Sequence, residues 1–137
     1  MQNRVQYPLT SLSVVIPVFN ERGNIGPLVE EVVRQLRGKI AFDIVCVDDR
    51  SDDDTREVLA WLKAEVPELR VLLHQQRSGQ SLAIRNGVRQ AMSPWIATLD
   101  GDGQNDPADI MKLVAVYQAA DDKTRLIAGW RTERKDT

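Results

Sequence analysis

Short apolar runs alternate with amphipathic segments along the chain. The runs are nearly continuous and rich in β-branched residues, which is typical of strands buried on both faces of a sheet. They predict strands at 12–19, 42–49, 69–74, 95–100 and 125–130. Between the runs, apolar residues recur at helical spacing, which predicts helices with one buried face. These helices are expected at 24–37, 52–66, 81–91 and from Pro107 onward.

Polar side chains mark where each predicted helix begins. Asn, Asp and Ser side chains accept hydrogen bonds from the free N–H groups of a first helical turn. The residues expected in this role are Asn24, Asp53 or Asp54, Ser81 and Asp106. On the third helix, the residues expected to face inward are Ala83, Ile84, Gly87, Val88 and Ala91, with Arg85 and Arg89 on the other side.

The alternation of strands and helices also predicts the fold. Short connections between them form right-handed βαβ units, so the sheet is expected to be mainly parallel and covered on both faces. The sequence therefore predicts an α/β, doubly wound (Rossmann-like) fold with strand order 3-2-1-4 for the first four strands. In such a sheet, ligands bind beyond the carboxyl ends of the strands, where the order reverses. The segments PVFNE, DDRSDDD and DGDGQND follow those ends, so we expect them to converge on one crevice.

The composition of the 137 residues fits one domain with a substantial core, since 42% are hydrophobic and 28% are charged. With 18 basic against 20 acidic residues, the net charge is −2, which excludes the basic field that nucleic-acid binding needs. Cys46 lies inside an apolar run, where an inert, buried thiol in a reducing compartment is expected. No run approaches the roughly 20 residues of a membrane span and no signal peptide is recognisable, so a cytoplasmic chain is expected.

The segment after the fourth apolar run concentrates oxygen ligands. Asp100 and Asp102 flank a glycine, so both carboxylates can approach one hard cation, with Gln104 near enough to add a neutral oxygen. Mg²⁺ or Mn²⁺ fits this donor set and normally completes its shell with water and substrate phosphates, so a phosphate-bearing substrate is implied. An EF-hand loop is excluded because Asn105 and Met111 occupy its glycine and glutamate positions. The plainer alternative is a solvated loop at a strand end.

Other phosphate chemistries fit less well. The first strand is followed by neither a G-x-G-x-x-G nor a Walker A loop, which disfavours dinucleotide and P-loop sites. A phospho-acceptor receiver would need its acidic pair after strand one, whereas Asp48 and Asp49 follow strand two. A haloacid-dehalogenase-like phosphatase stays as an alternative, because its Asp-x-Asp-Gly motif resembles LDGDGQ, although that motif normally opens the domain and ends in threonine. A catalytically silent nucleotide- or metal-binding module is the other alternative.

Five segments together resemble the family-2 glycosyltransferases, specifically the dolichol-phosphate mannose synthase-like and bacterial polyprenyl-phosphate sugar transferases. The segments are VVIPVFNE, VDDRSDDDT, GQSLAIRNG, LDGDGQNDP and AGWRTERKD, in the same order and at the same strand ends. The resemblance covers residues 1–137 and implies the nucleotide-sugar-binding part of a GT-A domain. It further implies a GDP- or UDP-linked sugar donor, a Mg²⁺ or Mn²⁺ ion, and inverting transfer to a polyprenyl phosphate, either dolichyl or undecaprenyl.

The resemblance assigns residues to parts of the donor site. Those expected at the nucleotide are Pro17, Asn20, Glu21, Asp49 and Asp100, with Asp49 at the base and Asp100 beside the ribose and diphosphate. Those expected at the metal are Asp102 and Gln104, and those expected at the phosphates are Arg131 and Arg134. The expected catalytic set is Asp100, Asp102 and Arg131.

Two positions depart from the family pattern. The common DDGS is DDRS here, with Arg50 in place of the glycine. The usual lysine-glycine pair of the third loop appears as Arg77 and Gly79, which exchanges one cation for another. A phosphate acceptor is already an anionic nucleophile, so the resemblance requires no strong general base, and His74 at a strand end is interpreted as structural.

The end of the sequence follows an apolar run without a closing helix, so a truncated chain is expected. The family's acceptor elements come after the fifth strand, which implies donor binding without complete sugar transfer. Membrane contact is expected through residues beyond 137, at the cytoplasmic face of the membrane. Trp61 and Trp95 are expected to pack in the core or at its rim, and Trp130 is a candidate to line the site.

Overall fold

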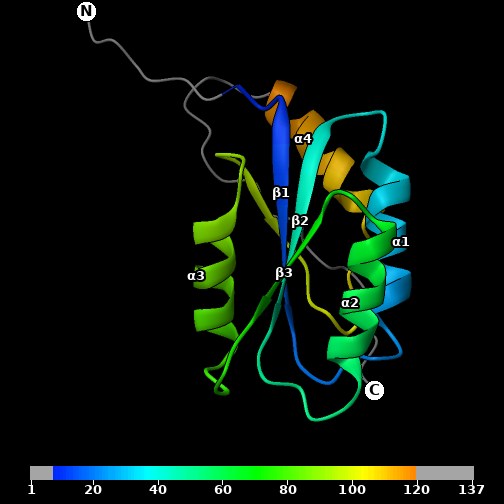
Figure 1. Cartoon of the computed structure of the whole chain (residues 1–137). Helices are drawn as coiled ribbons and strands as arrows, with labels where there is room; N and C mark the ends of the chain where they lie inside the picture. Colours follow the sequence, from blue (N-terminus) through cyan, green and yellow to red (C-terminus); the bar gives the residue numbers. More distant parts are fainter. Residues whose placement is uncertain (1–7, 120–137) are drawn as a thin grey trace, which may run out of the picture.

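The computed structural model describes residues 8–119, in which strands and helices alternate strictly (Figure 1). The strands are β1 (Ser11–Val18), β2 (Ala41–Asp48), β3 (Leu69–Leu73) and β4 (Ile96–Thr98). The helices are α1 (Ile25–Leu36), α2 (Thr55–Glu65), α3 (Gln80–Gln90) and α4 (Ala108–Ala119). The strands pair in parallel in the order β3-β2-β1-β4, which confirms the predicted doubly wound sheet. The strand predicted at 125–130 lies outside the described residues.

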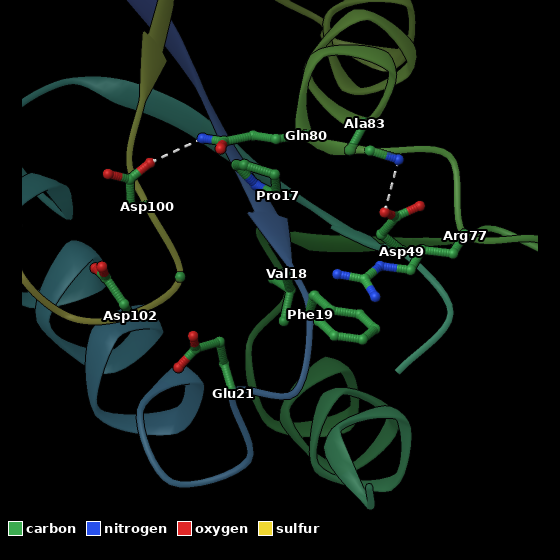
Figure 2. Close-up of a pocket in the computed structure, with 12 residues that line it drawn as sticks. Pro17, Val18, Phe19, Glu21, Asp49, Arg77, Gln80, Ala83, Asp100 and Asp102 are labelled. Atoms are coloured by element: carbon green, nitrogen blue, oxygen red, sulfur yellow. Dashed lines mark hydrogen bonds between the residues drawn. The ribbon is translucent and has the colours of Figure 1, made fainter. Parts of the chain in front are cut away.

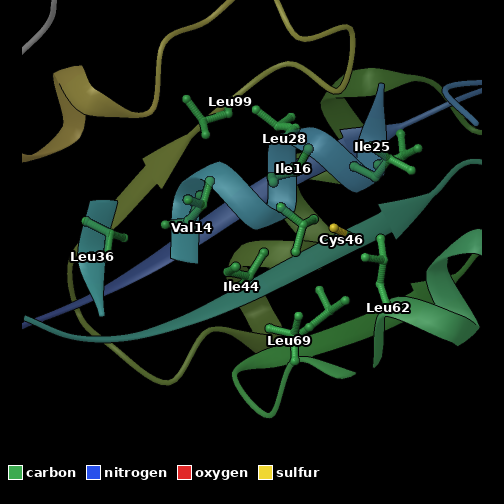
Figure 3. Packing of buried hydrophobic residues seen from close by; sticks show 14 of the residues in the cluster. Val14, Ile16, Ile25, Leu28, Leu36, Ile44, Cys46, Leu62, Leu69 and Leu99 are labelled. Atoms are coloured by element: carbon green, nitrogen blue, oxygen red, sulfur yellow. The ribbon is translucent and has the colours of Figure 1, made fainter. Parts of the chain in front are cut away.

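Helices cover the two faces of the sheet unequally. α1 contacts α2 and α4 on one face, whereas α3 packs against β1 and β2 on the other (Figure 1). Side chains alternate along β1, so Ile16 points into the larger core under α1 and α2, and Val15 points into the smaller core under α3. Figure 3 shows the larger core, where Leu28 of α1 packs on side chains from β1 and β2. The continuous apolar runs are thus explained by burial on both faces.

Gly87 brings α3 close to the sheet. A Cβ atom at this position would lie 3.1 Å from Val47 Cγ2, which is a tight contact, and 2.5 Å from Val15 Cγ1, which is closer than real Cβ atoms come. With hydrogen in place of Cβ, the helix backbone rests directly on the strands. This contact fixes α3 relative to the ends of β1 and β2.

The start and the outer face of α3 differ from the prediction. The helix begins at Gln80 with Gly79 as its N-cap, so the expected capping role of Ser81 is wrong. The N–H of Gly79 instead donates to a carboxylate on the neighbouring strand end, which sets the helix start from outside the helix. Val88 is exposed rather than inward-facing, because it lies about 100° around the helix from the buried Gly87.

One strand and one tryptophan also differ from the prediction. β4 has three residues, so the predicted strand at 95–100 is too long at both ends. Trp61 is 60% exposed on α2, so its expected packing is wrong. Trp95 does pack, because its ring lies 4.4 Å from that of Tyr117 and against the larger core.

The predicted helix caps have different outcomes. Asp106 Oδ1 accepts a hydrogen bond at 3.0 Å from a backbone N–H in the first turn of α4, which confirms its capping role. At α2, the side chain of Asp53 accepts from the N–H of Thr55 at 2.9 Å, whereas Asp54 occupies the N-cap position without such a bond. Asn24 makes no side-chain cap at α1.

The cysteine lies in the larger core. Cys46 is fully buried, and burial raises the pKa of its thiol to about 12. The thiol therefore stays protonated near neutral pH, as the inert role predicted from the sequence requires.

Among residues 8–119, no helix combines the length and apolarity needed to cross a membrane.

Candidate functional site

A cavity of about 360 Å³ opens at the carboxyl ends of β1, β2 and β4 (Figure 2). It lies where the strand order reverses between β1 and β4, at the predicted place. Its volume is in the range of small-molecule sites. The lining comes from all three predicted segments, from the loop before α3 and from α3 itself: Pro17, Val18, Phe19, Glu21, Asp49, Arg77, Gly79, Gln80, Ala83, Asp100, Gly101 and Asp102. The predicted convergence of the strand ends is confirmed.

The β2 end of the cavity is built around one hydrogen-bonded carboxylate. The backbone N–H of Asp49 donates to Val18 O at 2.8 Å, which ties β2 to β1. Asp49 Oδ1 contacts His74 Nδ1 at 2.9 Å and accepts from the N–H of Ser78 at 2.7 Å, while Oδ2 accepts from the N–H of Gly79 at 2.9 Å. Burial by itself raises the pKa of the Asp49 carboxyl, but these hydrogen bonds outweigh it, so the pKa lies below its usual value. Asp49 is therefore a fixed anion in the cavity wall.

Asn20 holds the loop after β2 against the end of β1. Its Oδ1 accepts from the backbone N–H groups of Asp52 at 2.8 Å and Asp53 at 3.3 Å, and its own N–H donates to Ser51 Oγ at 2.9 Å. Asn20 and Arg50 both have left-handed backbones, with φ of 52° and 65°. Arg50 thus adopts a conformation that favours the glycine of the DDGS pattern. Asn20 shapes this loop and is not among the lining residues.

Pro17 and Glu21 line the β1 side of the cavity. The N–H of Glu21 donates to Thr55 Oγ1 at 3.0 Å, and its Oε2 accepts from Asn24 Nδ2 at 2.8 Å. In Figure 2 the Glu21 carboxylate lies on the same side of the cavity as Asp102. Glu21 therefore adds negative charge near the loop that follows β4.

The β4 end of the cavity carries two exposed carboxylates. Asp100 Oδ1 accepts from Gln80 Nε2 at 3.1 Å, and Asp102 Oδ1 accepts from the backbone N–H of Gln104 at 2.9 Å. Neither carboxylate pairs with Lys or Arg among residues 8–119. Gly101 between them is buried, and a Cβ there would lie 3.0 Å from a backbone oxygen of β1. The side chain of Gln104 is exposed and outside the cavity lining.

The charge on the cavity wall is strongly negative. The described lining residues include four carboxylates and one cation, namely Glu21, Asp49, Asp100 and Asp102 against Arg77. A diphosphate would be repelled by this wall unless cations accompany it. The exposed oxygens of Asp100 and Asp102 suit Mg²⁺ or Mn²⁺, but within residues 8–119 no group of three His, Cys, Asp or Glu side chains is placed to hold an ion by itself. Such an ion would complete its shell with phosphate and water.

Among the lining residues with no role assigned from the sequence, two make specific side-chain contacts. Phe19 lies under Arg77, whose Cζ is 3.9 Å from the centre of the ring, and Gln80 holds Asp100. Phe19 directly follows β1 and Gln80 is the first residue of α3, both at the edge of the sheet where ligands bind. This position in the sequence is the signal by which they could have been predicted. Three predicted site residues lie outside the described residues: Trp130, Arg131 and Arg134.

Two solved structures share this architecture. Residues 1–349 of S. aureus TarS in complex with UDP-GlcNAc align with a TM-score of 0.67 and 24% identity, covering 80% of this chain and 31% of that chain. The mannosyltransferase PcManGT from Pyrobaculum calidifontis in complex with GDP-Man and Mn²⁺ aligns with a TM-score of 0.62 and 22% identity, covering 72% of this chain and 30% of that chain. These likenesses confirm the predicted GT-A fold.

Curated relatives match the chain more closely in sequence. The dodecaprenyl-phosphate galacturonate synthase of Rhizobium johnstonii is 38% identical over 127 residues, covering 91% of this chain and 37% of the relative. The undecaprenyl-phosphate 4-deoxy-4-formamido-L-arabinose transferase of Pseudomonas savastanoi pv. phaseolicola is 36% identical over 136 residues, covering 96% and 39%. The chain thus spans less than two-fifths of the length of these relatives. Residues 13–136 match the family described as Glycosyl transferase family 2, and the chain therefore belongs to this family.

Proposed function

We propose that the cavity binds the nucleotide diphosphate part of a nucleotide sugar together with Mg²⁺ or Mn²⁺. The observation that carries this proposal is a cavity at the switch point of the sheet with one fixed carboxylate at its β2 end and two exposed carboxylates at its β4 end. We further propose that the protein transfers the sugar, with inversion, to a polyprenyl phosphate. Membership of the family and the names of the two relatives support this second step.

The base belongs at the β2 end in this proposal. Asp49 is held by three hydrogen bonds, and an ionised carboxylate can accept about four. The remaining lone pair can accept a hydrogen bond from an N–H group on the ligand. Guanine and uracil both present such a donor, so a GDP- or a UDP-linked sugar fits the site. Pro17 and Glu21 would border the nucleotide from the β1 side.

The diphosphate belongs at the β4 end. Asp100 would lie beside the ribose and diphosphate, and Asp102 with Gln104 would hold the metal ion. When bound, a divalent cation neutralises the charge that develops on a leaving diphosphate. Arg131 and Arg134 are proposed as further phosphate contacts.

The acceptor side requires less from these residues. A polyprenyl phosphate is already anionic and can attack without a strong general base. His74 lies behind Asp49 and does not line the cavity, so it is not placed to act as one. Because such acceptors are lipids, we propose that the protein works at the cytoplasmic face of a membrane.

Of the two alternative functions, one is excluded and the other needs an activity assay. The haloacid-dehalogenase-like phosphatase is excluded, since the chain belongs to glycosyl transferase family 2 and its Asp-x-Asp motif follows β4 rather than opening the domain. A catalytically silent binding module would bind the same nucleotide without turnover. Metal-dependent release of nucleotide from a nucleotide sugar distinguishes the two.

Titration calorimetry tests the donor site. UDP and GDP are titrated into the chain with and without Mn²⁺, and Mn²⁺ should raise the affinity for one of them. Asp102→Asn should remove that gain, whereas Asp109→Asn, an exposed carboxylate in the first turn of α4, serves as the matched control. Equal Mn²⁺ dependence in wild type and Asp102→Asn would overturn the metal assignment.

A transfer assay tests the proposed reaction. The chain is incubated with UDP- and GDP-sugars, Mn²⁺ and a short polyprenyl phosphate, and a longer protein that includes these residues is assayed in parallel. We expect sugar-phospholipid from the longer protein and donor binding without transfer from residues 1–137, since the relatives are more than twice as long. Nucleotide binding without transfer by the longer protein would favour the silent module.

A further inference from the structure

We propose that His74 is a positioning residue that holds Asp49 for the nucleotide as a neutral imidazole with its proton on Nδ1, and that Asn86 on α3 selects this form. The proposal rests on the proposed function, because Asp49 is the carboxylate assigned to the base. Its observations are independent of that assignment, since they concern contacts inside the protein. They form a chain of side chains from α3 to the cavity wall.

The imidazole of His74 is enclosed behind the cavity. Its side chain is 9% exposed, and it does not line the cavity. The backbone N–H of His74 donates to Asp48 O at 2.9 Å, and the carbonyl accepts from the guanidinium of Arg56. The residue is therefore fixed by its backbone as well as by its ring, directly after the end of β3.

Each ring nitrogen of His74 contacts a group of defined hydrogen-bonding type. Nδ1 lies 2.9 Å from Asp49 Oδ1, and an ionised carboxylate can only accept, so Nδ1 carries a proton. Nε2 lies 2.9 Å from Asn86 Nδ2, and this amide nitrogen can only donate, so Nε2 presents its lone pair. A single form of the ring satisfies both contacts, namely the neutral imidazole protonated on Nδ1.

The contact with His74 is one of three that fix the direction of the Asp49 carboxylate. Asp49 Oδ1 is shared between the ring and the N–H of Ser78, and Oδ2 accepts from the N–H of Gly79, which is the N-cap of α3. Removing the ring leaves a buried cavity on one side of the carboxylate and frees it to rotate away from the ligand. The loop 75–79 and the start of α3 would then lose one of their anchors. Asn86 ties the other side of the ring to the same helix.

Replacements of His74 separate positioning from general stability. The amide nitrogen of asparagine is bonded to Cγ, like Nδ1 of histidine, so His74→Asn can keep the contact with Asp49. His74→Gln places its amide near the Nε2 position and loses that contact, and His74→Leu loses both. The control is Ser93→Ala, which removes a buried hydroxyl at the opposite end of the strands.

The readout is the dissociation constant of UDP and GDP without metal, measured by calorimetry. We expect about tenfold weaker binding for His74→Leu and His74→Gln, and a change within about threefold for His74→Asn. Ser93→Ala should lower stability without changing the dissociation constant. Equal affinities for wild type and His74→Leu, or equal losses for His74→Asn and His74→Leu, would overturn the inference alone. A wild-type chain that binds neither nucleotide would overturn the proposed function and with it the ligand role of His74.

NMR tests the state of the ring without any ligand. The chain contains one histidine, so its ring ¹⁵N signals need no further assignment between residues. Near neutral pH we expect a protonated shift for Nδ1 and an unprotonated shift for Nε2. Asn86→Asp should convert the ring to the imidazolium form, because a carboxylate at this position requires a proton on Nε2. A proton on Nε2 in the wild-type chain would overturn the inference, and this result is available even where a His74 variant fails to fold.

Discussion

The two ends of the cavity treat their carboxylates in opposite ways. At the β2 end, Asp49 is 5% exposed and is held by an imidazole and two backbone N–H groups. At the β4 end, Asp100 and Asp102 are exposed, and within residues 8–119 the side chain of each accepts one hydrogen bond, from a neutral group. At the β2 end, groups of the protein itself hydrogen-bond the carboxylate. At the β4 end, the negative charge of the two carboxylates is left for a cation that binds with the ligand to neutralise.

This difference separates two kinds of recognition. A fixed carboxylate with one free lone pair accepts a hydrogen bond only from a ligand whose donor lies along that lone pair. This suits a neutral, planar group with an N–H donor. Exposed carboxylates on a loop select by charge and can adjust to an ion that brings its own water and phosphate ligands. Changes at the β2 end should therefore affect folding and metal-free binding. Changes at the β4 end should affect the metal-dependent part of binding.

The largest expected effect comes from removing the buried carboxylate. Asp49→Ala leaves His74, Ser78 and Gly79 without their acceptor, which should lower the free energy of unfolding by about 2–4 kcal/mol. It should also weaken metal-free nucleotide binding. Asp102→Ala removes an exposed carboxylate and should change stability by less than about 0.5 kcal/mol. Urea denaturation of both variants measures the contrast, and similar losses for the two would show that the ends do not differ as described.

The second prediction concerns the contact between the ends. A Cβ at Gly101 would lie 3.0 Å from Pro17 O and 3.4 Å from Glu21 Cγ, so Gly101→Ala must push the β4 loop away from β1. We expect a loss of about 1–2 kcal/mol in stability, with Mn²⁺-dependent affinity reduced and metal-free affinity retained. Gly23→Ala is the control, because a Cβ there meets nothing within 4 Å. If Gly101→Ala lowers the metal-free affinity as much as the Mn²⁺-dependent affinity, the two ends of the cavity do not act independently.

The third prediction uses the pH dependence of stability. The hydrogen bonds to Asp49 hold its pKa in the folded state below the ordinary value of 3.8. Ionised Asp49 therefore contributes stability above that ordinary value, and the contribution is lost as the pH falls through the folded value. The difference in unfolding free energy between wild type and Asp49→Asn should shrink from about pH 5 to about pH 3. If the difference in unfolding free energy stays constant over this pH range, the negative charge of Asp49 does not contribute to the stability of the fold.

The two ends also differ in how far the sequence predicts them. The β4 end is predictable, because Asp100 and Asp102 sit close together in the chain and directly after an apolar run. The strand order and the position of the crevice follow from the same alternation of elements. At the β2 end, the sequence indicates Asp49 but not its contact with His74. The two residues lie 25 positions apart, and their contact depends on side-chain geometry.

Two of the wrong predictions, those for Val88 and Ser81 on α3, share a physical cause. Helical periodicity locates a buried face to about one residue, so Val88 beside the buried Gly87 was placed on the wrong side. The N-cap of α3 is Gly79, whose N–H donates to Asp49 at the end of β2, and local sequence rules that favour Ser81 do not include a partner from another strand. In both cases the tertiary contact decides what the local pattern leaves open.

The smallest expected effect concerns Arg77, which lies between the two ends. Its guanidinium stacks on Phe19, with Cζ 3.9 Å from the ring centre, and it is the one cation among the described lining residues. An exposed ion pair with a diphosphate contributes about 0.5–1 kcal/mol, so Arg77→Leu should weaken nucleotide diphosphate binding by roughly two- to fivefold.

Replacement by lysine shows which end Arg77 serves. Lysine keeps the charge but loses the planar group that stacks. If Arg77 acts by charge on the diphosphate, Arg77→Lys should bind within about twofold of wild type, and Phe19→Leu should have little effect. We expect this result, because the other charged residues that line the described part of the cavity are all carboxylates. Calorimetry with UDP and GDP measures all three variants. Equal losses for Arg77→Lys, Arg77→Leu and Phe19→Leu would instead assign the stacked pair to the base, and Arg77 would then belong to the β2 end.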